Sequence, residues 1–214
     1  MKKIIDDIIR FENELKANDN LTLIEFNYFN SPANISQLNE LETGRMIEKS
    51  VLDFYRISDG FEISWDADDD DLHQGDINGR LKINPFQQVV TNWKGVVYFD
   101  NEPAESPVRK FFPMDFFANE AAVGFCTKEG YQEMLYFFNF EDELKPLCVN
   151  IRGYLQLMLL AKACYYWQYL ILDILDESES EVSQRIKTRL SKIFPGFSFQ
   201  AFSEKFNEVR LSQF

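Results

Sequence analysis

The sequence contains few of the residues on which catalytic and metal sites depend. Its one histidine, His73, lies in a polar stretch beside acidic residues, where a solvated loop side chain is expected. The three cysteines, Cys126, Cys148 and Cys164, have no CxxC spacing, which argues against a structural zinc site. No GxGxxG and no GxxxxGK[ST] motif occurs, and no flanking motif supports a Cys–His or Ser–His pair. We therefore expect a protein that is not an enzyme and binds no cofactor.

Basic residues are also scarce. The 214 residues include 22 Lys and Arg against 35 Asp and Glu, so the formal net charge is −13 at pH 7. Such a surface repels the phosphates of nucleic acids and the headgroups of anionic membranes. It attracts a basic protein and accelerates the encounter with it. The charge therefore favours a basic protein partner and argues against nucleic acid or membrane binding.

The cysteines and the N-terminal residues predict a reducing compartment. The three thiols are odd in number, far apart and set in apolar surroundings, which is typical of small buried hydrophobic side chains. Lys2 and Lys3 would suit a signal peptide, but Asp6 and Asp7 interrupt any apolar run after them. We therefore expect a cytoplasmic protein.

The chain is organised around residues 51–66, VLDFYRISDGFEISWD. The apolar side chains of the first five residues have helical spacing. Gly60 can then adopt the left-handed conformation that ends many helices. Phe61, Ile63 and Trp65 alternate with polar residues, as in a strand with one buried face. We predict a helix, a glycine turn and a strand, with Trp65 in the core.

Hydrophobic periodicity predicts most other elements. Residues 21–29 suit either a strand or a packed loop. The expected helices cover Ile4 to Leu15, 85–93, 182–193 and 202–209, and the expected strands cover 75–83, 95–100, 121–127 and 134–140. The last two strands are expected to form a hairpin through a short connection that contains Gly130.

Residues 154–175 are predicted to form one long apolar helix. Gln156, Lys162 and Gln168 point about 120° apart around such a helix, so burial on most sides is expected. A membrane span is the alternative. A central lysine costs about 3 kcal/mol on insertion scales, and the flanks lack a basic bias. We therefore expect a buried helix, with Trp167 in the core.

Several of these motifs together resemble the SUKH superfamily, which includes the yeast cell-wall-synthesis regulator and many bacterial immunity proteins. The resemblance covers residues 46–172 and lacks the Leu-Pro pair that often starts the family's helix, since Arg45-Met46-Ile47 stands there. The residues that carry it are Asp59-Gly60 and Trp65, Ile83-Asn84-Pro85, Pro113-Met114-Asp115-Phe116, Val123-Gly124-Phe125, Tyr154 and Trp167.

The resemblance implies an α+β fold in a single domain, residues 1–214, with an N-terminal helix and a C-terminal helical extension. Its sheet is expected to be mainly antiparallel, with about five strands surrounded by helices. The implied function is direct binding and neutralisation of a cognate bacterial toxin, often a nuclease. A non-catalytic regulatory scaffold and a small-ligand-binding domain are the alternatives.

Two acidic segments that follow strand ends are the candidate partner-binding sites, because loops at strand ends are free to carry function. A solvated surface that serves solubility is the alternative for each. The first does not fit a calcium loop, since Asp71 replaces the required glycine and Ile77 the required glutamate. We expect a solvated loop with no metal site there, and weak cation binding by the clustered carboxylates is the alternative. The candidate residues are Asp66, Asp68, Asp69, Asp70 and Asp71 in the first segment, and Glu141, Asp142 and Glu143 in the second.

Overall fold

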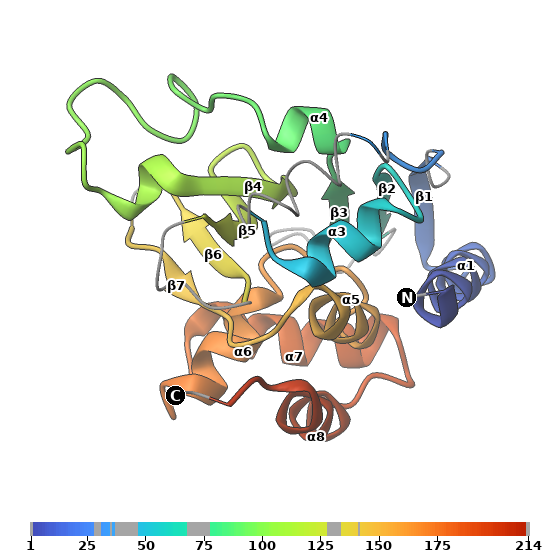
Figure 1. Cartoon of the computed structure of the whole chain (residues 1–214). Helices are drawn as coiled ribbons and strands as arrows, with labels where there is room; N and C mark the ends of the chain where they lie inside the picture. The colour runs from blue at the N-terminus through green and yellow to red at the C-terminus, as the bar shows by residue number, and fades with distance from the viewer. Residues whose placement is uncertain are drawn as a thin grey trace. The chain divides into compact units, whose positions relative to one another are not determined.

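The computed structural model describes residues 2–27, 31–34, 36, 47–67, 78–127, 134–140 and 142–212 (Figure 1). Its helices are α1 (Lys2–Lys16), α3 (Lys49–Tyr55), α4 (Phe86–Val89), the 3-10 helix η2 (Pro107–Lys110), α5 (Ile151–Leu160), α6 (Gln168–Leu175), α7 (Glu181–Ile193) and α8 (Phe199–Val209). Its strands are β1 (Leu21–Asn27), β2 (Phe61–Ala67), β3 (Asn78–Ile83), β4 (Phe111–Asp115), β5 (Ala121–Cys126), β6 (Tyr136–Asn139) and β7 (Lys145–Pro146).

The predicted α+β class with a mainly antiparallel sheet is confirmed. Hydrogen-bonded strands follow one another in chain order from β1 to β7. The described part of the chain thus contributes seven strands, where about five were expected. The sequence pattern did not indicate β4, which contains Pro113, or the two-residue β7.

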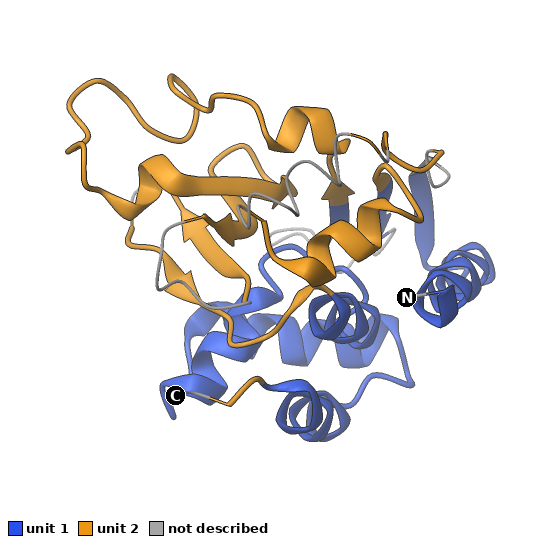
Figure 2. Ribbon diagram, viewed as in Figure 1, with its two compact units in different colours: residues 1–27, 62–81, 152–210 blue, residues 28–61, 82–151, 211–214 orange. Residues whose placement is uncertain are grey.

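The chain divides into two compact units, each built from separate segments (Figure 2). Unit 1 contains residues 1–27, 62–81 and 152–210, and unit 2 contains residues 28–61, 82–151 and 211–214. Neither unit is a continuous piece of chain, so the division cannot be predicted from a linker in the sequence. The organisation of residues 1–214 as one domain stays a prediction.

In unit 1, the predicted first helix is present as α1. Its buried side chains follow the helical period and include Ile4, Ile8, Phe11 and Leu15. The following segment is a strand, since β1 pairs antiparallel with β2. Trp65 in β2 is fully buried, as predicted, and its indole N–H donates a hydrogen bond of 2.8 Å to the Lys162 carbonyl.

The prediction of one helix over residues 154–175 is wrong. The chain forms α5 and α6 instead, and residues 161–167 lie between them. Lys162, Ala163 and Tyr166 adopt positive φ angles of 57°, 51° and 62°. These angles are unfavourable for residues with side chains, so other contacts must stabilise the break.

Backbone hydrogen bonds to β3 stabilise this break. The Arg80 N–H donates to the Ala163 carbonyl (2.8 Å), and the Tyr165 N–H donates to the Asn78 carbonyl (2.9 Å). Apolar periodicity cannot indicate such long-range bonds, and residues 161–167 contain no Gly or Pro. Among the described residues, no helix is long and apolar enough to cross a membrane.

The C-terminal helices of unit 1 agree with the sequence pattern. Ser180 caps α7, because its side chain accepts a hydrogen bond from the Ser183 N–H. Trp167 is buried as predicted, with its ring 4.9 Å from Tyr154 and 6.1 Å from Phe202 between ring centroids. The final predicted helix is present as α8.

In unit 2, the predicted helix and glycine turn before β2 are confirmed. α3 ends at Tyr55, and Gly60 has a φ of +92°. The buried Tyr55 hydroxyl donates to the Asn84 carbonyl at 2.9 Å, and the Asp59 carboxylate accepts from the Phe86 N–H at 2.6 Å. Burial, with the charges of Asp59 and Asp115 as lesser causes, raises the pKa of Tyr55 well above its usual value.

The predicted hairpin strands are also present, since β5 pairs antiparallel with β6. Their connection lies mostly outside the described residues. The strand predicted for residues 95–100 is wrong, because this segment forms turns. The Gly95 N–H bonds to the Tyr98 carbonyl (2.7 Å), and the Val97 N–H bonds to the Trp93 carbonyl (2.9 Å).

Candidate functional site

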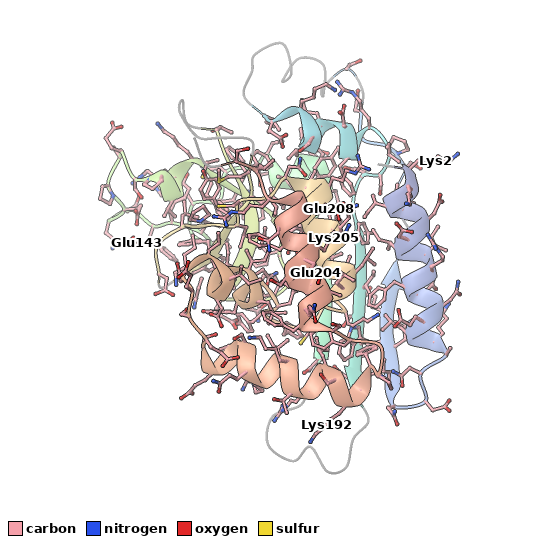
Figure 3. The ribbon with its side chains drawn as sticks, turned by 90° about the horizontal axis from the view of Figure 1, so that it is seen from below. Lys2, Glu143, Lys192, Glu204, Lys205 and Glu208 are labelled. Carbon is pink, nitrogen blue, oxygen red and sulfur yellow. The ribbon has the colours of Figure 1, made fainter. Side chains whose placement is uncertain are left out.

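The structure places only some of the predicted binding residues. Asp66 lies in β2 opposite Thr22 and is half-buried, so its assignment to an exposed loop is wrong: the pairing with β1 carries the strand on to Ala67. Asp142 and Glu143 are exposed on the turn after β6, and Figure 3 shows Glu143 at the outer edge of that turn. His73 lies outside the described residues. So do the other predicted binding residues, which are Asp68, Asp69, Asp70, Asp71 and Glu141.

Asp142 and Glu143 border a hollow of about 890 Å³ in unit 2. We call it the aromatic hollow. The segment between α4 and β4, which runs outward and returns in Figure 1, forms one wall, and β6 with its following turn forms the other. The lining residues are Val96, Val97, Tyr98, Phe99, Asn101, Glu102, Ser106, Pro107, Val108, Tyr136, Phe138, Phe140, Asp142, Glu143 and Leu144.

The floor of the aromatic hollow belongs to the core of unit 2. Val97, Tyr136 and Phe138 are buried members of one hydrophobic cluster. The Phe138 ring lies 5.7 Å from Phe111 and 5.2 Å from Phe140 between centroids. Since these side chains are fixed by packing, the floor is a preformed apolar surface.

Residues 92–100, here called the 92–100 turn, form the outer part of the first wall and are held by several bonds. The Asn92 side-chain oxygen accepts from the Lys94 N–H (3.0 Å) and from the Tyr98 hydroxyl (2.7 Å). The Trp93 indole donates to the Val89 carbonyl (2.8 Å), and its ring stacks on Phe116 with centroids 5.7 Å apart. The turn is therefore anchored at both its backbone and its side chains.

Two apolar side chains of the 92–100 turn nevertheless face solvent. Val96 is 47% exposed and Phe99 is 59% exposed. They account for two of the five large hydrophobic side chains that are exposed in the described part of the chain. Single exposed hydrophobic residues are ordinary, but neighbouring ones beside an apolar hollow are typical of interaction sites.

Arg109 stabilises the same wall through its contacts with two parts of it. Its Nε donates to the carbonyls of Glu102 and Pro103, each at 3.0 Å, and its guanidinium lies 5.2 Å from the centre of the Tyr98 ring. With these bonds Arg109 ties residues 102–103 to the 92–100 turn. The guanidinium is thus engaged in holding the wall.

Three carboxylates border the aromatic hollow: Glu102, Asp142 and Glu143, here called the acidic rim. Within the described chain, the carboxylates of Glu102 and Glu143 have no ion-pair or hydrogen-bond partner. Asp142 lies 3.9 Å from the Lys145 ammonium, which is a weak exposed pair. The acidic rim is therefore available to cations from outside.

The sequence indicated only part of this site. Asp142 and Glu143 were identified from their charge. Val96 and Phe99 were missed, because residues 95–100 were assigned to a strand, and Glu102 was missed because no local pattern sets it apart from the other acidic residues. Asn92 and Gly95 are the turn signals that would have corrected this, since asparagine bonds its own backbone and Gly95 has a φ of +86°.

The described residues contain no group of three or more His, Cys, Asp or Glu side chains that would suit a metal ion. Their cysteines are free, and Cys148 and Cys164 are buried as expected, whereas Cys126 is half-buried. Burial raises the pKa of the Cys126 and Cys164 thiols to about 12. Both are thus protonated near neutral pH.

A thiol-labelling experiment tests this environment. We expect Cys126 and Cys164 to react with iodoacetamide far more slowly in the native protein at pH 8 than after unfolding in urea, because only the thiolate reacts. Mass spectrometry of labelled peptides gives each rate. Equal rates in the native and the unfolded protein would contradict the assigned burial.

Comparison of the chain with protein-family models, with curated proteins and with solved structures finds no match. The resemblance to the SUKH superfamily therefore depends on the residues quoted for it and stays a prediction.

Proposed function

We propose that this chain is a non-catalytic immunity protein that neutralises a cognate bacterial toxin by binding it directly. The observation that carries the proposal is the aromatic hollow with its acidic rim, on a chain of net charge −13. A toxin that acts on nucleic acid presents cations to phosphates, and an acidic protein can cover that surface. The SUKH resemblance adds support of a separate kind. In this proposal the protein works in the cytoplasm.

The aromatic hollow has features of a protein-binding surface. Interfaces combine an apolar centre, in which aromatic residues are enriched, with a polar rim. Here the centre consists of fixed aromatic and aliphatic side chains, and carboxylates stand at the border. The exposure of Phe99 and Val96 is accounted for if a partner covers them.

A small-ligand-binding domain is the second candidate, because the volume of about 890 Å³ lies in the range of ligand pockets, roughly 300–1,000 Å³. Two exposed apolar side chains on one wall favour the protein partner. Small-molecule pockets bury most of their ligand's surface, whereas the 92–100 turn presents apolar surface outward.

The test uses the protein encoded by the reading frame beside this chain's gene, which the proposal expects to be basic. We expect the two purified proteins to form a complex that survives gel filtration, and co-expression to restore growth that the basic protein alone arrests. Association should slow as salt rises, because exposed charges act mainly on the encounter. A neighbour that arrests growth but neither binds this chain nor is neutralised by it would refute the proposal.

A further inference from the structure

We infer that the aromatic hollow holds one segment of the partner, in which a lysine or arginine stands next to an aromatic or long aliphatic side chain. The inference deepens the proposed function and rests on it for the identity of the partner protein. The apolar side chain is expected to lie against Val96, Phe99 and the floor of the hollow, and the cation against the acidic rim.

Apolar surface remains exposed at the edge of the aromatic hollow. Phe99 and Val96 face solvent beside buried Val97, Tyr136 and Phe138, so apolar surface continues from the 92–100 turn into the floor. An occupant with only charged groups would leave this surface in water. An aromatic or aliphatic side chain removes it from water, which is the main favourable contribution to association.

Two carboxylates of the acidic rim remain available to a cation. The carboxylates of Glu102 and Glu143 have no partner among the described residues, and both border the hollow. Aromatic faces such as that of Phe140 also attract cations, since their quadrupole is negative above the ring. The same surface repels acidic segments and phosphates. Lysine and arginine, with apolar stems and cationic ends, suit both halves.

The wall is held in place before a partner arrives. Asn92, Trp93 and Arg109 hold its backbone through the hydrogen bonds described above, and Lys94 pairs with Asp100 at 2.6 Å. A rigid wall loses little conformational entropy on binding. This favours a segment that fits the existing surface.

The probes are fluorescein-labelled twelve-residue peptides, measured by fluorescence anisotropy against the full-length chain. In the first, lysine and phenylalanine alternate; in the second, glutamate replaces lysine; in the third, serine replaces phenylalanine. We expect only the first to bind well, with the other two weaker by about tenfold or more, because each lacks one half of the contact.

Two variants of the hollow are compared with a matched control. Phe99→Ser removes the exposed anchor, and the double variant Asp142→Asn with Glu143→Gln removes two charges of the acidic rim. The control, Glu204→Gln with Glu208→Gln, removes two charges from the exposed face of α8 in unit 1 (Figure 3). It makes the net charge less negative by the same amount as the double variant of the hollow, so it separates contact at the hollow from general attraction.

We expect Phe99→Ser to weaken binding of the first peptide by about tenfold, as for an interface anchor. The double variant should weaken binding of the first peptide by about threefold or more at low salt. The control variant should weaken it by less than half of that factor. All of these sites are exposed, so the melting curves should match the parent. Equal affinity of parent and both hollow variants for the first peptide would overturn the inference.

The same variants, assayed with the cognate basic protein, separate this inference from the proposed function. If that protein binds the parent and both hollow variants with equal affinity, the chain is a binding protein whose docking site lies elsewhere, and only the inference fails. If N-acetyl-lysine amide competes as well as the first peptide, the hollow is a small-ligand site and the inference is again refuted.

Discussion

Replacing Trp65 with alanine is expected to lower the free energy of unfolding by about 3–5 kcal/mol, the usual cost of deleting a large buried aromatic side chain. The indole is fully buried, packs edge-on against Phe194 at 5.4 Å between centroids, and donates its hydrogen bond to the Lys162 carbonyl. Deletion leaves a cavity and also leaves that carbonyl without its donor. Urea unfolding followed by circular dichroism measures the change.

Trp65→Phe is the matched variant, since it retains much of the ring but not the N–H group. The free energy of unfolding of Trp65→Phe should therefore lie between that of the parent and that of the alanine variant. An unchanged melting curve for Trp65→Ala would contradict the assignment of Trp65 to the core.

Gly79 provides a second check on the position of the Trp65 ring. A Cβ atom on Gly79 would lie 2.1 Å from the indole nitrogen, so Gly79→Ala should also destabilise the protein. The double variant Gly79→Ala with Trp65→Ala should be less destabilised than the sum of the single variants, because the clash disappears with the ring. Strict additivity would show that the two residues are not in contact.

Local patterns in the sequence were sufficient for the elements whose stabilisation is local. The period of Ile4, Ile8 and Leu15 defines α1, Ser180 caps α7, and Gly60 takes its positive φ directly before β2. Each of these signals depends on residues within a few positions of one another, so no knowledge of the fold is needed.

The break between α5 and α6 could not be predicted in this way. The apolar period continues through residues 161–167, and the conformation there is stabilised by backbone bonds to β3, about 80 residues earlier in the chain. Tertiary contacts thus override a strong local preference for helix, and they do so at alanine and lysine, which are good helix formers.

Of the candidate site, the sequence predicted only two of the charged residues. Asp142 and Glu143 were found because acidic residues are visible in any context. The aromatic hollow depends on the path of the 92–100 turn, which hydrogen bonds of Asn92 and stacking of Trp93 on Phe116 determine. A stretch of apolar residues such as Val96 to Phe99 resembles a strand unless those bonds are known.

The Gly60 turn allows a second large effect to be predicted. Gly60→Ala is expected to lower the free energy of unfolding by about 2–4 kcal/mol. Gly60 has a φ of +92°, and a Cβ atom there would lie 2.3 Å from the Ile83 carbonyl oxygen and 3.0 Å from the Asn84 carbonyl carbon. Both neighbours are backbone atoms of the segment that also accepts the Tyr55 hydrogen bond, so neither can move without disturbing that bond.

Two other glycines serve as matched controls, because they separate the causes. Gly95 has a φ of +86° with no atom within 4 Å of an added Cβ, and Gly196 has equally open space without a positive φ. All three substitutions reduce the conformational entropy of the unfolded chain alike. Gly95→Ala therefore measures backbone strain without a steric clash, expected at about 1–2 kcal/mol. Gly196→Ala involves neither backbone strain nor a clash of the added Cβ atom. Urea unfolding should rank the losses Gly60, Gly95, Gly196, and equal losses at Gly60 and Gly95 would show that the Ile83 carbonyl lies farther from Gly60 than the structure places it.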